Sequence, residues 1–192
     1  MAPGSALPRD IRTVFLDRDG VLNAKAPEGE YVKSWKEFQV LPGVPEAVAR
    51  LNRAGLRTIV VSNQRGIARG LYTVEDVEAL HGRLQELLKE HGAHIDAFFI
   101  CPHREGECNC RKPLTGLYEQ AVARFPEISA AASVMVGDSA ADMEFGRRLG
   151  MATVWVEGDP QHRAPGAASA CASADARCYC LAEAVELILC GG

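Results

Sequence analysis

The sequence lacks any apolar run that approaches the roughly 18 residues needed to span a membrane. It also lacks an excess of positive charge, since its formal net charge is -4 and its pI is about 5.8. Nucleic acid and anionic membranes both demand a basic face, so neither is expected as a partner. Residues 1–10 show no positive segment followed by an apolar core, which favours a cytoplasmic location over secretion.

The rest of the composition is close to the globular average, with 47% hydrophobic and 24% charged residues in 192. This length suits one domain with a substantial core, and no internal repeat is found. We therefore expect a single domain over residues 1–192, monomeric by default, with its core at about 12–159 and a cysteine-containing tail at about 160–192. Gly158 to Ala176 is rich in Ala, Pro, Ser and Gly, and is expected to wrap the surface or fray.

Short β-rich apolar runs alternate with patterns of helical spacing along the chain. The expected strands cover residues 13–16, 58–61, 95–100, 133–136 and 153–156. Thr73 with Asp76 resembles a capping box at the start of a long amphipathic helix. Alternation of this kind favours right-handed crossovers, and it predicts an α/β fold with a Rossmann-like parallel sheet in three α/β/α layers.

Polar side chains follow the expected strands, where sheets of this kind bind their ligands. Asp17 and Asp19 place two carboxylates two residues apart, so that one could attack an electrophile while the other handles a proton. The same Asp-x-Asp-Gly turn also occurs in calcium loops and ordinary β-turns. Ser62 ends a second strand.

Asp138 ends a further expected strand and could meet Asp17 across the sheet. Together they would form an oxygen-rich site for a hard divalent cation, and Mg²⁺ suits that ligand set. The alternative is helix capping, because Asp138 or Ser139 could cap the helix that begins near Ala140. Asp142 is expected to serve this helix more than a metal.

Four soft-metal ligands gather in one short loop before Lys112. The pattern Cys-x-His-x4-Cys-x-Cys offers three thiolates and one imidazole, the ligand set of a closed structural Zn²⁺ site, from Cys101, His103, Cys108 and Cys110. This predicts a metal-pinned loop that delivers Lys112 to the active site. Cys171, Cys178, Cys180 and Cys190 are expected to be reduced or buried thiols, with a second metal site or a disulfide as weaker alternatives.

Four motifs, in order, resemble those of the haloacid dehalogenase superfamily phosphatases. They are Asp17-x-Asp19-Gly20-Val21-x-Asn23, Ser62-Asn63-Gln64, Arg111-Lys112-Pro113 and Gly137-Asp138-Ser139-x-x-Asp142. More narrowly, the stretch from Ser62 to Gly70 and the metal loop are similar to the D-glycero-D-manno-heptose 1,7-bisphosphate 7-phosphatase and histidinol-phosphate phosphatase family. The resemblance covers roughly Arg12 to Asp159.

This resemblance implies a phosphoenzyme mechanism. Asp17 would be the nucleophile and Asp19 the general acid and base, with Mg²⁺ held by Asp17, the backbone carbonyl of Asp19, and Asp138. Ser62 and Lys112 would stabilise the transferring phosphoryl group. Substrate contacts would come from Asn63, Gln64, Arg65, Arg111 and Ser139. An acid role near neutral pH requires the pKa of Asp19 to rise, which burial favours and Mg²⁺ opposes.

The resemblance also implies removal of the 7-phosphate of heptose bisphosphate, a step in nucleotide-activated heptose and lipopolysaccharide biosynthesis. Histidinol phosphate, or another small sugar phosphate, is the alternative substrate. Only about 40 and 50 residues separate the first three motifs, so a capless enzyme is expected. A zinc-stabilised binding module on an inactive scaffold is the non-enzyme alternative, and it would be expected to have lost Asp17, Asp19, Lys112 or Asp138.

Overall fold

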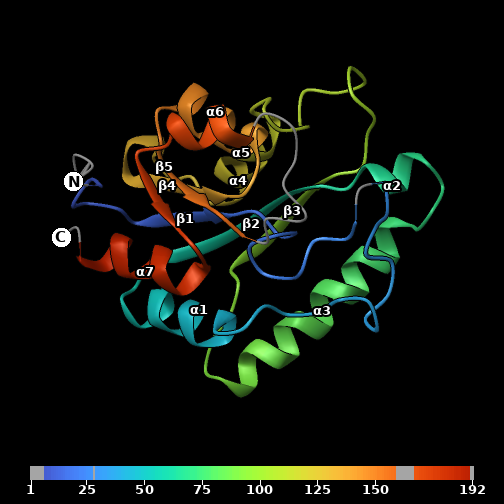
Figure 1. Cartoon of the computed structure of the whole chain (residues 1–192), viewed down its shortest axis with the longest axis horizontal. Helices are drawn as coiled ribbons and strands as arrows, with labels where there is room; N and C mark the ends of the chain where they lie inside the picture. The colour runs from blue at the N-terminus through green and yellow to red at the C-terminus, as the bar shows by residue number, and fades with distance from the viewer. Residues whose placement is uncertain (1–6, 28, 159–166, 191–192) are drawn as a thin grey trace.

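The computed structural model describes residues 7–27, 29–158 and 167–190 and contains one six-stranded parallel sheet (Figure 1). The strand order is β3-β2-β1-β4-β5-β6. The strands are β1 Thr13–Leu16, β2 Arg57–Asn63, β3 Ala97–Cys101, β4 Ser133–Gly137, β5 Ala152–Val156 and β6 Ala176–Cys178. The expected α/β class with a parallel sheet is confirmed.

Helices cover both faces of this sheet (Figure 1). One face carries α1 Val44–Arg53, α3 Val74–Glu90 and α7 Leu181–Cys190, and the other carries α4 Gly116–Arg124, α5 Ala140–Leu149 and α6 Ala167–Ala172. The short helix α2 Arg65–Ala68 follows β2, and a 3₁₀ turn, η1 Ala130–Ala132, precedes β4. The three-layer arrangement follows, because each face of a parallel sheet must be buried.

The two faces define two cores through the alternation of side chains along each strand. In β1, Val14 and Leu16 pack into the core below α1, α3 and α7, whereas Phe15 packs into the core below α4 and α5. In β4, Met135 belongs to the same core as Phe15. Continuous burial of both faces explains why these strands are apolar runs.

Helices α3 and α5 begin where the sequence provides side-chain caps. Thr73 and Asp76 form the expected capping box at α3, with both reciprocal hydrogen bonds present. At α5, Ser139 is the N-cap residue and forms a second capping box with Asp142. Of the two capping candidates, Ser139 therefore caps this helix.

The chain reverses its direction of travel across the sheet at β1. Leu16 lies beside Val60 of β2 on one side and Val136 of β4 on the other. The residues that follow these three strands therefore lie side by side at the carboxyl ends of the strands, where the two halves of the sheet meet. Ligands of doubly wound sheets bind at this switch point.

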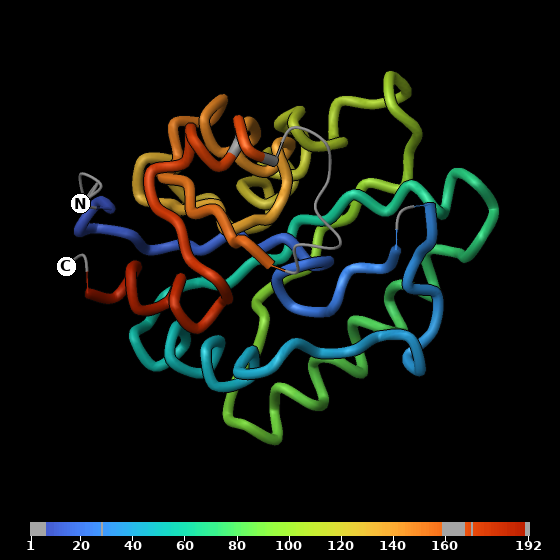
Figure 2. Tube along the Cα trace, viewed as in Figure 1, coloured from blue at the N-terminus to red at the C-terminus, as the bar shows by residue number. Residues whose placement is uncertain are grey.

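The C-terminal part of the chain is more ordered than its composition suggested. Helix α6 lies within the segment expected to wrap the surface or fray, and its residues 168, 169 and 172 are exposed, while residues 159–166 lie outside the described part. Strand β6 extends the sheet beside β5. Figure 2 shows α7 beside α1, and both contribute to one core.

The connections between the strands around the site consist of loops and helices. In the described part of the chain, β1 and β2 are joined by residues 17–43 and α1, and β2 and β3 by α2 and α3. The described residues of these connections form no separate cap domain. None of the described helices is long and apolar enough to cross a membrane.

Two leucines of α7 test whether this helix belongs to the core. Leu181 is 2% exposed, whereas Leu187 is 38% exposed. We expect Leu181→Ala to lower the free energy of unfolding by about 2–5 kcal/mol through the cavity that it leaves. Leu187→Ala should change it by less than about 0.5 kcal/mol. Urea unfolding followed by circular dichroism measures both, and equal effects would contradict this placement of α7.

Candidate active site and metal loop

Lys112 lies at the centre of the site, 3% exposed. Its Nζ donates to Asp17 Oδ1 at 2.9 Å, to Asp142 Oδ1 at 2.6 Å and to the Val61 carbonyl at 2.7 Å. Burial alone lowers the pKa of Lys112, but the charges of Asp142 and Asp17 outweigh it and raise that pKa. Lys112 is therefore a fully paired, buried cation.

Asn63 fixes the backbone of Lys112. Its amide Nδ2 donates to the Lys112 carbonyl at 3.0 Å, and its Oδ1 accepts from the Lys112 N–H at 2.9 Å. Both polar atoms of the side chain are thus directed at the third motif. The sequence suggested a substrate contact for Asn63, and the structure adds a positioning contact that the sequence did not reveal.

Asp17 follows β1 directly, and its Oδ1 accepts from the Arg18 backbone N–H at 2.8 Å as well as from Lys112. The described residues place no donor on its Oδ2. Burial and the charge of Asp142 raise the pKa of Asp17 to about 7, although Lys112 opposes this. Asp17 thus has one oxygen held in place and one available for chemistry.

Asp17, Asp138 and Asp142 present carboxylate oxygens within 4.8 Å of one another. The Oδ1 of Asp138 is buried without a hydrogen-bond partner, and its Oδ2 accepts from Lys25 Nζ at 2.7 Å. Gly20 packs on this carboxylate: its φ is 94°, and a Cβ there would lie 2.3 Å from Asp138 Oδ2. An unpartnered buried oxygen in a group of carboxylates suits a hard divalent cation.

Asp19 is held by several donors. Its Oδ1 accepts from Arg18 Nη2 and Asn23 Nδ2, both at 2.9 Å, and its Oδ2 accepts from Gln64 Nε2 at 3.1 Å. Burial alone raises the pKa of Asp19, but the charge of Arg18 and these hydrogen bonds outweigh it and lower the pKa. The rise that an acid role requires is therefore not present in this arrangement.

Gln64 is buried beneath the rim where a substrate contact was expected. It is 2% exposed, and its Nε2 donates to Ser62 Oγ at 2.8 Å as well as to Asp19. Its Oε1 accepts from the Tyr72 hydroxyl at 2.8 Å. This side chain links the second motif to the first, and its position favours a positioning role.

The other three residues expected to contact substrate lie in different settings. Arg65 donates from Nε to the hydroxyl of Tyr31 at 3.2 Å, and Tyr31 lines the same cavity as Asp138. Arg111 has a buried Nη1 without a hydrogen-bond partner. Ser139 donates from Oγ to Asp142 Oδ2 at 2.5 Å, in the capping box of α5.

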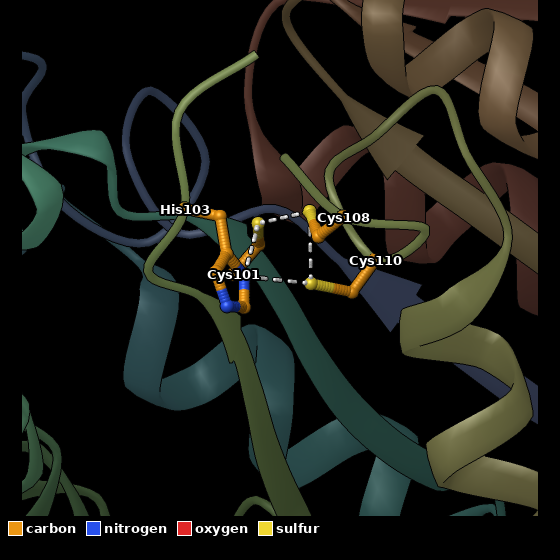
Figure 3. A group of neighbouring side chains, drawn as sticks. All are labelled: Cys101, His103, Cys108 and Cys110. Carbon is orange, nitrogen blue, oxygen red and sulfur yellow. Dashed lines mark hydrogen bonds between the residues drawn. The ribbon is translucent and has the colours of Figure 1, made fainter. Parts of the chain in front are cut away.

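The four predicted zinc ligands converge in the loop between β3 and α4 (Figure 3). The Sγ of Cys108 lies 3.5 Å from that of Cys101 and 3.4 Å from that of Cys110. His103 Nδ1 lies 3.8 Å from Cys101 Sγ and 3.4 Å from Cys110 Sγ. A tetrahedral zinc ion with Zn–S bonds of about 2.3 Å separates its sulfur ligands by roughly 3.8 Å, so the cluster fits Zn²⁺.

Three contributions to the site were missed by the sequence reasoning. Asp142 pairs with Lys112 in addition to capping α5, Arg18 is 1% exposed and pairs with Asp19, and Lys25 pairs with Asp138. Arg18 stands at the unspecified position between Asp17 and Asp19 of the first motif, directly beside the carboxylate that it holds. Lys25 has no periodic or motif signal, since its partner is 113 positions away.

The comparisons with known proteins agree with this fold. The haloacid dehalogenase-like hydrolase family matches residues 8–150, about three quarters of the chain. The chain therefore belongs to the haloacid dehalogenase-like hydrolases.

Individual relatives are closely similar. A D-glycero-alpha-D-manno-heptose-1,7-bisphosphate 7-phosphatase from Mycobacterium tuberculosis is 38% identical over 161 residues, 83% of this chain and 76% of the relative. A D-glycero-beta-D-manno-heptose-1,7-bisphosphate 7-phosphatase from Bordetella bronchiseptica is 38% identical over 143 residues, 74% of this chain and 78% of the relative.

A solved structure extends the likeness to three dimensions. The crystal structure of D,D-heptose 1,7-bisphosphate phosphatase from B. bronchiseptica, complexed with magnesium and phosphate, matches with a TM-score of 0.82 and 32% identity. The match covers 95% of this chain and 100% of that chain. The fold is thus shared over nearly the whole length of both proteins.

The raised pKa of Asp17 predicts how Mg²⁺ binding depends on pH. Below a pKa of about 7 the carboxyl is protonated, and a cation must displace that proton to bind. Magnesium affinity should therefore fall by about tenfold per pH unit below pH 7 and level off above it. Calorimetric titration from about pH 5 to pH 9 measures this. An affinity that is flat below pH 7 would contradict the raised pKa.

Proposed function

We propose that this protein is a magnesium-dependent phosphatase that removes the 7-phosphate of D-glycero-D-manno-heptose 1,7-bisphosphate through an aspartyl-phosphate intermediate. The observation that carries the proposal is Asp17, held beside Lys112 and next to the carboxylate of Asp138. A nucleophile, a buried cation and a cation-binding carboxylate are the parts that phosphoryl transfer requires.

The first step is attack by Asp17 on phosphorus. The fixed Oδ1 orients the carboxylate, so that Oδ2 can form the new bond while the sugar oxygen leaves. The Lys112 ammonium and the Ser62 hydroxyl stand beside the strand end, where charge builds on the phosphoryl oxygens. The cation, held by Asp17, Asp138 and the backbone carbonyl of Asp19, would offset the repulsion between the carboxylate and the phosphate dianion.

Asp19 is the proton carrier in both half-reactions. It gives its proton to the leaving sugar oxygen, and it then accepts a proton from the water that attacks the aspartyl phosphate. Arg18, Asn23 and Gln64 hold both of its oxygens, so the carboxyl group cannot rotate away from the reacting atoms. Gln64 couples this orientation to Ser62.

Zinc would have a structural role in this enzyme. A closed set of three thiolates and one imidazole leaves no coordination position for a substrate. Cys110 is two residues from Lys112, and Arg104 of the same loop donates from Nε and Nη2 to the Ala68 carbonyl of α2, at 3.3 and 3.1 Å. A zinc ion would therefore fix the loop that supplies Lys112.

The names of the relatives favour heptose bisphosphate over histidinol phosphate. One relative is named for the alpha anomer and the other for the beta anomer, and both have the same sequence identity to this chain. We therefore propose the sugar without assigning its anomer. The non-enzyme alternative is not supported, because the residues that it should have lost are all present and gathered at one site. A cytoplasmic, monomeric enzyme remains our prediction.

A comparison of substrates tests the proposed activity. We expect at least one heptose 1,7-bisphosphate anomer to exceed histidinol phosphate in kcat/KM by roughly tenfold or more, measured as phosphate release with Mg²⁺. Asp17→Asn should lower turnover by roughly a thousandfold or more while its circular dichroism spectrum is unchanged. Faster hydrolysis of histidinol phosphate would overturn the substrate, and full activity of the variant would overturn the mechanism.

The zinc role has its own test. Cys108→Ser removes one ligand, so we expect the variant to lose bound zinc and to turn over more slowly through a misplaced Lys112. Cys190→Ser, in an exposed position of α7, should keep both zinc and turnover. Elemental analysis of purified protein measures the metal, and wild-type protein without zinc would refute the assignment.

A further inference from the structure

Lys25 makes an ion pair that no step of the proposed mechanism uses. It lies in the segment after the first motif, and its Nζ is 2.7 Å from Asp138 Oδ2. The Lys25 side chain is 28% exposed and that of Asp138 is 11% exposed. A flexible lysine thus reaches inward to a carboxylate that we assign to the Mg²⁺ site.

Lys25 is the hydrogen-bond partner of the Asp138 side chain among the described residues, because the other oxygen, Oδ1, has none. Burial raises the pKa of Asp138, and the charge of Lys25 is the largest influence that lowers it. The ammonium is therefore the main group that offsets the cost of burying this negative charge.

The balance of charges favours a divalent cation in place of Lys25 over a divalent cation beside it. When ionised, Asp17, Asp138 and Asp142 carry three negative charges, and Lys112 and Lys25 supply two positive ones. If a divalent cation bound while both lysines stayed in place, the site would carry a net positive charge. The same cation in place of Lys25 would leave the site neutral.

A cavity next to Lys25 gives its side chain room to move away from Asp138. Lys25 lines this cavity of about 1010 Å³, whose lining also includes Gly20, Asp138, Tyr179 and Cys180. An ammonium on a four-carbon stem is strongly hydrated and can rotate, so withdrawal into this space restores its contact with water.

We propose that Lys25 is a tethered counter-ion of the magnesium site, which pairs with Asp138 in the metal-free protein and is displaced into the adjacent cavity when Mg²⁺ binds. The inference rests on the magnesium requirement of the proposed function but not on the substrate. Lys25 remains charged in both states, and its position changes. It is a positioning residue that sets the affinity for the cation.

The first test is calorimetric titration of metal-free protein with Mg²⁺. Lys25→Met removes the competitor and keeps the length of the side chain, so we expect the Mg²⁺ Kd to fall by about tenfold. Lys33→Met is the matched control, because Lys33 lines the same cavity, is exposed and makes no ion pair with Asp138. An unchanged Kd in Lys25→Met, or an equal decrease in Lys33→Met, would overturn the inference.

Thermal unfolding gives a second readout on the same variants. Without metal, Lys25→Met leaves Asp138 buried and unpaired, so its Tm should lie below that of the wild type. Saturating Mg²⁺ should then raise its Tm by more than it raises the wild-type Tm, since the cation binds more tightly. An equal increase in both proteins would count against the inference.

Wild-type protein alone provides a third readout, which does not depend on how well a variant folds. Brief acetylation with acetic anhydride, followed by mass spectrometry, reports the accessibility of each lysine. Labelling of Lys25 should increase several-fold when Mg²⁺ is added, while labelling of Lys33 and Lys36 stays constant. Unchanged or reduced labelling of Lys25 in protein that binds Mg²⁺ would overturn this inference alone, and failure to bind Mg²⁺ would overturn the proposed function as well.

Discussion

The buried ammonium of Lys112 is the interaction on which the arrangement of the site depends. A cation removed from water is costly unless its donors are all paired, and here the three acceptors come from three different parts of the chain. Asp17 follows β1, the Val61 carbonyl belongs to β2, and Asp142 lies in the first turn of α5. The register of the sheet and the start of α5 must therefore be correct together for Lys112 to be buried.

The position of Lys112 depends in turn on a loop with little regular structure. Between β3 and α4 the chain forms no helix or strand, and two sets of contacts hold this loop in place instead. Asn63 binds the Lys112 backbone from the end of β2, and the four soft ligands close the loop around one point. The cluster fits Zn²⁺, and a zinc ion there would stabilise the loop and take no part in the reaction, unlike the cation that the oxygen ligands would hold.

The sequence predicted the fold well because the strands are buried on both faces and appear as short β-rich apolar runs. It predicted the convergence of Asp17, Ser62 and Asp138 because parallel strands end at one edge. It could not predict how the side chains there are paired. Asn63 and Gln64 follow a strand as polar residues, and nothing in their order shows that both turn inward.

Two other features could not be predicted from the sequence, for different reasons. The pairing of Lys25 with Asp138 joins two loops through tertiary structure alone, without a local pattern. Strand β6 has only three residues, Ala176 to Cys178, and too few alternating positions to distinguish it from a turn. Its place in the sheet depends on pairing with β5 and on packing against α7, and both contacts exist only once the chain has folded.

The lowered pKa of Asp19 has consequences for both half-reactions of the proposed mechanism. In the structure described here its donors favour the carboxylate, which is the form needed to activate water in the second half-reaction. In the proposed mechanism the first half-reaction needs the protonated form. An arriving phosphate dianion favours that form and works against the effect of Mg²⁺, since a nearby negative charge raises the pKa of a carboxyl group. Transfer of the phosphoryl group to Asp17 and departure of the sugar then reduce that negative charge. The substrate itself would thus switch Asp19 from acid to base, while Arg18 holds it ready for the second role.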